Sequence, residues 1–352
     1  MTTPTDRNPS EPAATPPLVT IADIRAAAAT LNGVTVRTPL VPLGRPIEGH
    51  PQGHPRLWLK PEMLQPIGAF KLRGAFNAVA SLNPDERARG VVAHSSGNHA
   101  QGVARAAHIL GIRAVVVMPS DAPDVKIAGV RADGAEIVMV GTSSDERVQV
   151  SEMLAREQGL VLIPAYDDRR IIAGQGTCGL EIVEQLAELG YGSTPFTVLV
   201  PIGGGGLASG VATAVKSLRP DAHVYGVEPE EAADAAQSLR EGRIVRWEAE
   251  QVGRTAADGM RTSALGVLTF QHLSTYADGV LTVSETDIRR AMVLAARSAR
   301  LIVEPSGATP LAAWLAHEGE LPAGPVVAIL SGGNADPGRY AELIAEGLAA
   351  GG

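Results

Sequence analysis

The architecture of this chain follows from the residues Thr197-Val198-Leu199-Val200-Pro201-Ile202-Gly203-Gly204-Gly205-Gly206, in which an apolar strand runs directly into four glycines. A helical pattern then continues to Leu218. Backbone N–H groups without Cβ atoms around them can close on an anion, and the start of a helix adds partial positive charge. No Lys-Ser or Lys-Thr follows, and the spacing is not G-x-G-x-x-G, so the loop differs from both common nucleotide loops. We predict a phosphate-binding loop for a compact cofactor, with a plain tight turn as the alternative.

The same order of strand, loop and helix recurs along the chain. Strands that are apolar throughout and alternate with helices indicate parallel sheets covered on both faces. We therefore predict an α/β protein with two open, twisted, mostly parallel sheets, helices on both faces and a cleft between them. The expected strands span 57–60, 90–94, 114–119, 136–140, 197–201, 224–227 and 326–330, and the expected helices span 21–31, 70–82, 126–133, 144–158 and the segments ending at Leu110 and Leu218.

A length of 352 residues suggests two domains, or one large α/β domain with an insertion. Residues 1–18 contain five prolines among Thr, Ser and Glu, and we expect a disordered tail there. We expect a large domain formed by 19–89 together with 168–352, and a small domain formed by 90–167.

Composition narrows the classes of partner. The net charge of −8 disfavours nucleic acid and anionic membranes, because both bind basic surfaces. Cys178 is the single cysteine, which excludes an internal disulfide and a cysteine-rich zinc site. No apolar run approaches a membrane span, and no secretion signal opens the chain. We expect a cytoplasmic protein that acts on a small molecule.

Two further loops follow predicted strands, where ligands of such sheets bind. The loop Ser95-Ser96-Gly97-Asn98-His99 offers hydroxyls, an amide and free helix N–H groups that can hold a carboxylate, although a serine there can also be a plain helix cap. Ser331-Gly332-Gly333 follows the last strand, and the Ser331 hydroxyl can offer a neutral hydrogen bond to a ring nitrogen. Taken alone, this last loop is better explained as another turn.

Lysine is rare in this chain, since only four of the 30 basic residues are lysines. One of them is Lys71, within Gly68-Ala69-Phe70-Lys71-Leu72-Arg73-Gly74, at the start of a predicted helix. A desolvated lysine can form an imine at neutral pH, whereas arginine cannot. Lys71 is therefore a candidate for a reactive amine, with an ordinary surface lysine as the alternative.

A short acidic segment follows the strand at 224–227. Glu228 and Asp234, with an intervening carbonyl, offer hard oxygen ligands of the kind that Mg²⁺ and Ca²⁺ bind. An acidic, solvated helix start is the alternative.

Together these segments resemble the fold-type II pyridoxal-phosphate enzymes, which have the tryptophan synthase β-like fold, in the branch of threonine dehydratase and serine racemase. The matching segments run in order from Lys60 to Asn334. The resemblance implies pyridoxal 5′-phosphate as cofactor, a small amino acid as substrate and a homodimer. It implies Lys71 as the Schiff-base lysine, Phe70 beside the ring, Asn98 on the phenolic oxygen, Ser331 on the pyridine nitrogen and a phosphate cup made of Gly203, Gly204, Gly205, Gly206 and Leu207. It further implies that Ser95, Ser96, Gly97, Asn98 and His99 bind the substrate carboxylate.

Within that branch, Ser96 is similar to the residue that serves serine racemases as a base on the opposite face of the ring. The spacing of Glu228, Ala232 and Asp234 is similar to the racemase metal site, with the Ala232 carbonyl as a ligand for Mg²⁺ or Ca²⁺. Ala165 stands where racemases carry Asn and many dehydratases carry Phe, so we expect room for a β-hydroxy amino acid bulkier than serine.

The resemblance implies β-elimination of threonine, serine or a related β-hydroxy amino acid to a 2-oxo acid and ammonia, that is, a lyase. The alternative is an amino-acid racemase with dehydratase side activity. A non-catalytic phosphate-binding or amino-acid-binding protein is the third possibility. Because little sequence follows the matched segments, we expect no isoleucine feedback.

Overall fold

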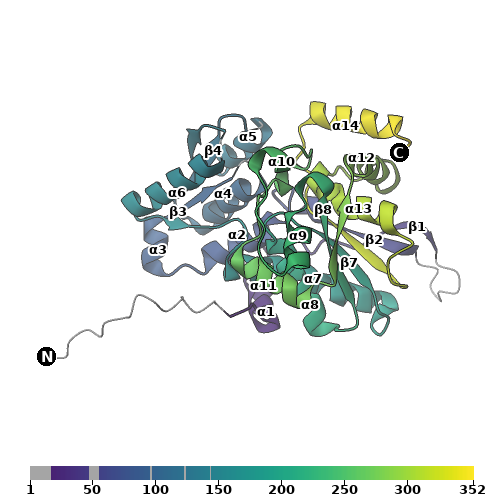
Figure 1. Ribbon diagram of the computed structural model, residues 1–352. Coiled ribbons are helices and arrows are strands. Elements are labelled where there is room, and N and C mark those ends of the chain that lie inside the picture. Colours follow the sequence, from purple (N-terminus) through teal and green to yellow (C-terminus); the bar gives the residue numbers. More distant parts are fainter. Residues whose placement is uncertain (1–16, 47–54, 96, 123, 143) are drawn as a thin grey trace.

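The computed structural model describes residues 17–46, 55–95, 97–122, 124–142 and 144–352 (Figure 1). The predicted disordered tail falls outside the described residues, apart from its last two positions, and Ser96 falls outside them as well.

Six strands form the larger sheet, in the order β1-β2-β10-β7-β8-β9. Every neighbouring pair is parallel except β1 and β2, which are antiparallel. The strands are β1 (Val41–Pro46), β2 (Pro55–Pro61), β7 (Thr197–Pro201), β8 (His223–Pro229), β9 (Gly279–Val283) and β10 (Val326–Leu330).

Four parallel strands form the smaller sheet, in the order β5-β4-β3-β6. They are β3 (Val91–His94), β4 (Ala114–Pro119), β5 (Glu136–Val140) and β6 (Val161–Leu162). All of them fall within the segment predicted as the small domain, and that domain division stays a prediction.

Alternate residues of the larger sheet bury opposite faces, as the pleat requires. Leu199 and Ala328 pack with helices α12 (Glu285–Leu294), α13 (Pro305–His317) and α14 (Pro337–Ala349). Val198 and Val327 pack on the other side with α7 (Arg169–Leu186), α8 (Gly206–Leu218) and α11 (Val267–Tyr276). Helix α1 (Ile21–Thr30) covers α7 and α8 (Figure 1). The shorter helices are α3 (Pro84–Arg89), α9 (Asp234–Glu241) and α10 (Ala249–Val252).

The smaller sheet is also covered on both faces. Val92 and Val115 pack against α6 (Ser144–Gln158). The other face packs against α4 (Asn98–Leu110) and α5 (Asp124–Ala132). Helix α2 (Lys71–Ala80) packs on both α4 and α7, so it lies between the two sheets.

The predicted fold class is confirmed, because two mostly parallel sheets are each covered on both faces. Strands β4, β5, β7 and β10 begin and end where the sequence predicts. Three short or marginal strands, β1, β6 and β9, were not predicted. No helix among the described residues is long and apolar enough to cross a membrane.

Candidate active site

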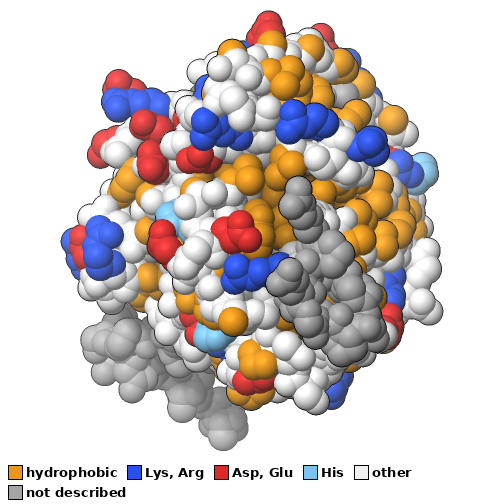
Figure 2. Space-filling view, turned by 90° about the vertical axis from the view of Figure 1, so that its right-hand side faces the viewer, with side chains coloured by type: hydrophobic (Ala, Val, Ile, Leu, Met, Phe, Trp, Pro, Cys, Tyr) orange, Lys and Arg blue, Asp and Glu red, His pale blue; other side chains and the backbone are white. Residues whose placement is uncertain are grey.

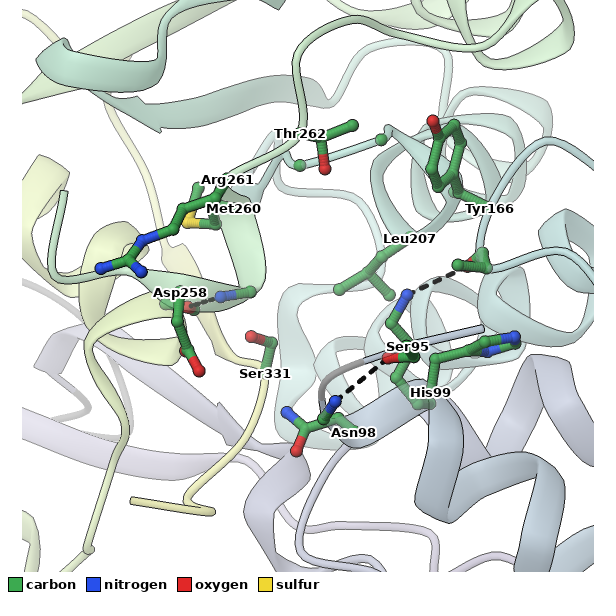
Figure 3. A pocket seen from close by; sticks show the side chains of 18 of the residues that line it. Ser95, Asn98, His99, Tyr166, Leu207, Asp258, Met260, Arg261, Thr262 and Ser331 are labelled. Carbon is green, nitrogen blue, oxygen red and sulfur yellow. Dashed lines mark hydrogen bonds between the residues drawn. The ribbon is translucent and has the colours of Figure 1, made fainter. Parts of the chain in front are cut away.

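A cavity of about 200 Å³ lies where the ends of both sheets meet. Residues at the starts of α2, α4 and α8 and at the end of β10 line it. These are positions where the chain passes from a parallel strand to a helix. In Figure 3, Asn98 and Ser331 approach it from one side, while Tyr166 and Thr262 lie on the opposite side. The sequence-predicted residues that line it are Phe70, Lys71, Ser95, Gly97, Asn98, His99, Gly203, Gly204, Gly205, Gly206, Leu207 and Ser331.

Lys71 is the first residue of α2, and its amine lies in the cavity wall. Its Nζ donates a hydrogen bond to the Ala165 carbonyl at 3.0 Å and lies 5.2 Å from the centre of the Phe70 ring. Burial lowers the pKa of the Lys71 amine to about 8, because no carboxylate among the described residues hydrogen-bonds to it and stabilises its charge. A substantial fraction of the amine is therefore neutral near physiological pH, as nucleophilic chemistry requires.

A short backbone ladder places Lys71 beside the end of β10. Ala69 forms an isolated antiparallel bridge with Gly332, and the Phe70 N–H donates to the Ser331 carbonyl at 3.0 Å. Gly68 has a φ of +73°, and a Cβ there would overlap Asn334. The ladder holds the segment before Lys71 against the Ser331 loop, so segments far apart in the sequence share one wall.

The four glycines lie at the junction of β7 and α8, where the sequence predicts a loop between a strand and a helix. Gly205 has a φ of +91°, which favours glycine, and a Cβ there would lie 2.8 Å from Thr269 Cβ. Tyr166 packs directly on the loop, because a Cβ at Gly204 would overlap its ring. The Thr269 hydroxyl donates to the Gly204 carbonyl at 2.8 Å. Tyr166 and Thr269 thus hold the loop in place, and the loop faces the cavity at the start of α8.

The loop after β3 is anchored at both ends. The Gly97 N–H donates to Ser95 Oγ at 3.1 Å. Asn98 Nδ2 donates to Glu304 Oε1 at 2.6 Å, and Asn98 Oδ1 accepts from Asn334 Nδ2 at 2.9 Å. Ser96 lies outside the described residues, so the predicted opposing base stays a prediction.

His99 is buried behind this loop as a neutral imidazole. Its Nε2 lies 3.0 Å from the Ile163 carbonyl, and its Nδ1 has no partner among the described residues. Burial and the nearby charge of Lys71 lower the pKa of His99 to about 3. His99 therefore offers an uncharged group to the cavity.

Several charged cavity residues were not predicted from the sequence. Lys126 Nζ pairs with Asp258 at 2.5 Å and lies beside Gly97. Although burial opposes its charge, Asp258 and Glu304 raise the pKa of Lys126. Arg147, from α6, lines the same cavity. The scarcity of lysine, which singled out Lys71, also marks Lys126, but no local pattern marks Arg147 or Glu304.

A buried ionic network fixes α2 just beyond Lys71. Arg73 donates to Glu62 at 2.7 Å and to Glu181 at 2.6 Å. Lys60 Nζ pairs with Glu181 at 2.6 Å and also donates to the Thr38 carbonyl. Because Lys60, Glu62 and Arg73 are all fully buried, removing one partner would leave an uncompensated charge.

The predicted metal ligands lie away from the cavity lining. Glu228 accepts hydrogen bonds from the N–H groups of Ala235 and Ala236, whereas Asp234 Oδ2 is buried without a partner among the described residues. Burial raises the pKa of Asp234 to about 7, and burial together with Asp234 raises the pKa of Glu228 well above its ordinary value. Within the described part of the chain, no group of three His, Cys, Asp or Glu side chains could hold a metal.

Comparison with known proteins gives consistent matches. A family model described as pyridoxal-phosphate dependent enzyme matches residues 31–332. An L-threo-3-hydroxyaspartate ammonia-lyase from Saccharomyces cerevisiae is 42% identical over 289 residues, covering 82% of this chain and 86% of that protein. A serine racemase from Schizosaccharomyces pombe is 39% identical over 290 residues, covering 82% of this chain and 87% of that protein. The crystal structure of a threonine deaminase from T.th. matches with a TM-score of 0.82 and 46% identity, covering 90% of this chain and 99% of that one.

Proposed function

Because the chain belongs to the family of pyridoxal-phosphate dependent enzymes, we propose that it eliminates the β-hydroxyl of an amino acid to give a 2-oxo acid and ammonia. The observation that carries this proposal is the Lys71 amine, with its pKa lowered to about 8, in the same cavity wall as the glycine loop and Ser331. The L-threo-3-hydroxyaspartate ammonia-lyase named above supports the same reaction.

The residues present fit the cofactor. The glycine loop at the start of α8 offers backbone N–H groups without Cβ atoms, which suits a phosphate. Lys71 supplies an amine that can be neutral, and Ser331 supplies a hydroxyl at the cavity wall. Phe70 lies against the Lys71 amine and offers an apolar ring surface.

When bound, pyridoxal phosphate makes the Cα proton of an attached amino acid acidic. Lys71 is the group positioned to accept that proton, because its amine is close to half neutral at about pH 8. The loop at 95–99 orients the substrate carboxylate through its serine hydroxyl and the start of α4. Ser331 is a neutral hydrogen-bonding partner, so no carboxylate at this position forces a proton onto the ring.

The charges of the cavity favour a substrate with a second carboxylate, such as 3-hydroxyaspartate. Arg147, which is half-buried, lines the cavity and donates to the Thr142 carbonyl at 3.0 Å. We assign Arg147 to the β-carboxylate, because it lines the cavity from α6, a helix of the smaller sheet that also carries Ser95 and Asn98 at its edge. Ala165, a small residue, also lines the cavity.

A substrate panel tests the proposal. Purified protein reconstituted with pyridoxal phosphate is given L-threo-3-hydroxyaspartate, L-threonine and L-serine, and both 2-oxo acid and ammonia are assayed. We expect stoichiometric formation of both products, with the highest kcat/KM for 3-hydroxyaspartate. Failure to release ammonia from any β-hydroxy amino acid would contradict the elimination.

Racemisation is the second candidate function, favoured by Ser96 in the substrate loop and by the serine racemase relative. Chiral analysis of recovered serine separates the two reactions. We expect Ser96→Ala to abolish racemisation and to spare much of the elimination of the L-enantiomer. Loss of both activities together would undermine the assignment of Ser96 as a second base.

We further infer a divalent cation, Mg²⁺ or Ca²⁺, held by Glu228, the Ala232 carbonyl and Asp234. Two buried carboxylates with raised pKa values, one of them with an unpartnered oxygen among the described residues, support a missing positive charge between them. A homodimer, expected from the family, and a cytoplasmic location, which the single cysteine fits, are the remaining inferences.

A further inference from the structure

Glu304 lines the cavity and contacts two of the segments that form it. The activity proposed above assigns it no role. It precedes α13, and its side chain is 3% exposed. Its backbone N–H donates to the Gly332 carbonyl at 3.1 Å, next to Ser331. Its Oε1 accepts from Asn98 Nδ2 at 2.6 Å. One residue thus touches both the loop that carries Asn98 and the loop that carries Ser331.

The second oxygen of this carboxyl is the unusual feature. Glu304 Oε2 is buried and has no hydrogen-bond partner among the described residues. An ionised carboxylate oxygen without a donor is unfavourable in such a place, whereas a protonated one carries no charge. Burial, and next the charge of Asp258, raise the pKa of Glu304 to about 7, against the opposing effects of Lys126, the Asn98 amide and the nearby backbone N–H of Asn334, which lies outside hydrogen-bonding geometry.

The charges that face Glu304 are largely engaged with each other. Asp258 from η4 (Asp258–Met260) and Lys126 from α5 face it, and they are paired with each other at 2.5 Å. Arg147 and Arg261 line both the cavity and the adjoining groove that Glu304 also lines. Ionised Glu304 would therefore place a negative charge beside Asn98, in a cavity that is proposed to take an anionic ligand.

We propose that Glu304 is a positioning residue that works in its protonated form: the neutral carboxyl fixes the Asn98 amide and keeps the cavity wall uncharged beside the ligand. The inference rests on the proposed function, in which that ligand is pyridoxal phosphate. Cofactor binding is then coupled to a proton on Glu304, so that affinity falls as the pH rises and the carboxyl ionises.

The matched variants are Glu304→Gln, which keeps the shape and cannot ionise, and Glu342→Gln, a surface control on α14 whose side chain is 64% exposed. Pyridoxal phosphate is titrated into the apo protein between pH 6 and 9, and Kd is measured from absorbance. Above pH 7, wild type and Glu342→Gln should lose up to about tenfold in affinity per pH unit relative to Glu304→Gln. Parallel curves for wild type and Glu304→Gln would overturn the inference, whereas no binding by wild type would overturn the proposed function itself.

Thermal unfolding of the apo proteins gives a readout that is independent of the cofactor. Because the pKa of Glu304 is raised from 4.5 to about 7 on folding, the native state binds this proton more tightly, and wild type loses stability as the pH rises through that window. The Tm advantage of Glu304→Gln should grow from about pH 4.5 to about pH 7 and then level off. A constant difference in Tm would contradict a protonated Glu304.

Asp258→Asn supplies a second test if Glu304→Gln fails to fold. Removal of the Asp258 charge, which also frees Lys126, should lower the pKa of Glu304. The pH midpoint of cofactor affinity should therefore move to lower pH. An unchanged midpoint would overturn the inference.

Discussion

Burial decides the chemistry of individual side chains in this cavity. The Lys71 amine loses solvent without gaining a carboxylate among the described residues, so its pKa falls to about 8. Lys126 loses solvent but gains Asp258, so its pKa rises instead. Two of the four lysines thus line one cavity, and the pKa of Lys71 is lowered while the pKa of Lys126 is raised. The difference comes from the partner that each one has.

Arg147 sets the substrate preference if the second-carboxylate proposal holds. Replacing it in Arg147→Met removes one charge-assisted hydrogen bond, worth roughly 1.5–3 kcal/mol. We expect kcat/KM for L-threo-3-hydroxyaspartate to fall by about ten- to a hundredfold, with a much smaller change for L-threonine. Arg156→Met is the matched control, because Arg156 lies on the same helix and is 73% exposed. Equal losses for both substrates would contradict the assignment.

At the scale of residues, the sequence predicted cavity residues in segments that follow strands. It did not predict cavity residues that other elements contribute. Lys71 and Asn98 begin helices and Ser331 follows a strand, each within a recognisable pattern, and the structure brings all three to one cavity. Arg147 lies in ordinary helical sequence and Glu304 directly precedes α13, and only the packing of α6 and α13 around the cavity brings them there. The properties of Glu304 depend on Asn98, 206 positions away in the sequence, which no local pattern contains.

Among the secondary-structure elements, the junction of β7 with α8 is the part most constrained by backbone geometry. Gly205→Ala would place a Cβ at a φ of +91° and 2.8 Å from Thr269 Cβ. The positive φ and the contact with Thr269 favour a shifted loop, and keeping the cofactor-binding conformation would cost on the order of 1–3 kcal/mol, so we expect a Kd for pyridoxal phosphate raised by about tenfold or more. Absorbance titration of the apo variant measures it.

Gly242→Ala is the control for the glycine loop. Gly242 also has a positive φ, +68°, but no described atom lies within 4 Å of its Cβ position. Both variants should lose some stability, and Gly205→Ala alone should lose cofactor affinity. Unchanged cofactor affinity in Gly205→Ala would remove this loop from the proposed phosphate site.

The junction of β8 with α9 carries the proposed cation site. Mg²⁺ or Ca²⁺ should raise the Tm of wild type relative to protein in EDTA, because a ligand that binds only the native state stabilises it. Asp234→Asn removes a proposed ligand and should abolish that response, whereas Asp336→Asn, at the start of α14, should retain it. Equal Tm values with and without cations would exclude the site.

Strands that are buried along their whole length were predicted more accurately than most edge strands. Strands β4, β7 and β10 are buried throughout, and their apolar runs define their ends. Strand β1 contains two prolines and a glycine, which is tolerated because it is an antiparallel edge strand. Strand β9 lies at the opposite edge and is only half-buried over most of its length. Edge strands need fewer apolar residues, so their signal is weaker, although the partly exposed edge strand β5 was predicted from its apolar run Ile137-Val138-Met139-Val140.

At the scale of the whole molecule, helix α2 connects the two sheets and carries Lys71 into the cavity. It packs on α4 and α7, it begins with Lys71, and Arg73 ties it to Glu62 and Glu181. The pairs Lys126–Asp258 and Asn98–Glu304 join helices α5 and α4 of the smaller sheet to segments that pack with the larger one. Movement of one sheet against the other would therefore change the cavity directly.

The surface is consistent with a protein that pairs with a second copy. Figure 2 shows a face on which hydrophobic side chains gather over the centre and right, with charged side chains among and around them. Exposed apolar side chains that gather on one face commonly mark an interaction site. We expect sedimentation equilibrium to give twice the mass of one chain, which is 36.4 kDa. A single-chain mass at micromolar concentration would contradict the homodimer.

The central claim is that Lys71 binds pyridoxal phosphate, and an absorbance spectrum tests it most directly. Wild type mixed with pyridoxal phosphate and freed of excess should show a band at about 410–420 nm, the region expected for the cofactor joined to a lysine. Lys71→Ala, treated in the same way, should lack the band while its far-ultraviolet circular dichroism stays unchanged. A wild type without the band, or a variant that keeps it, would contradict the account.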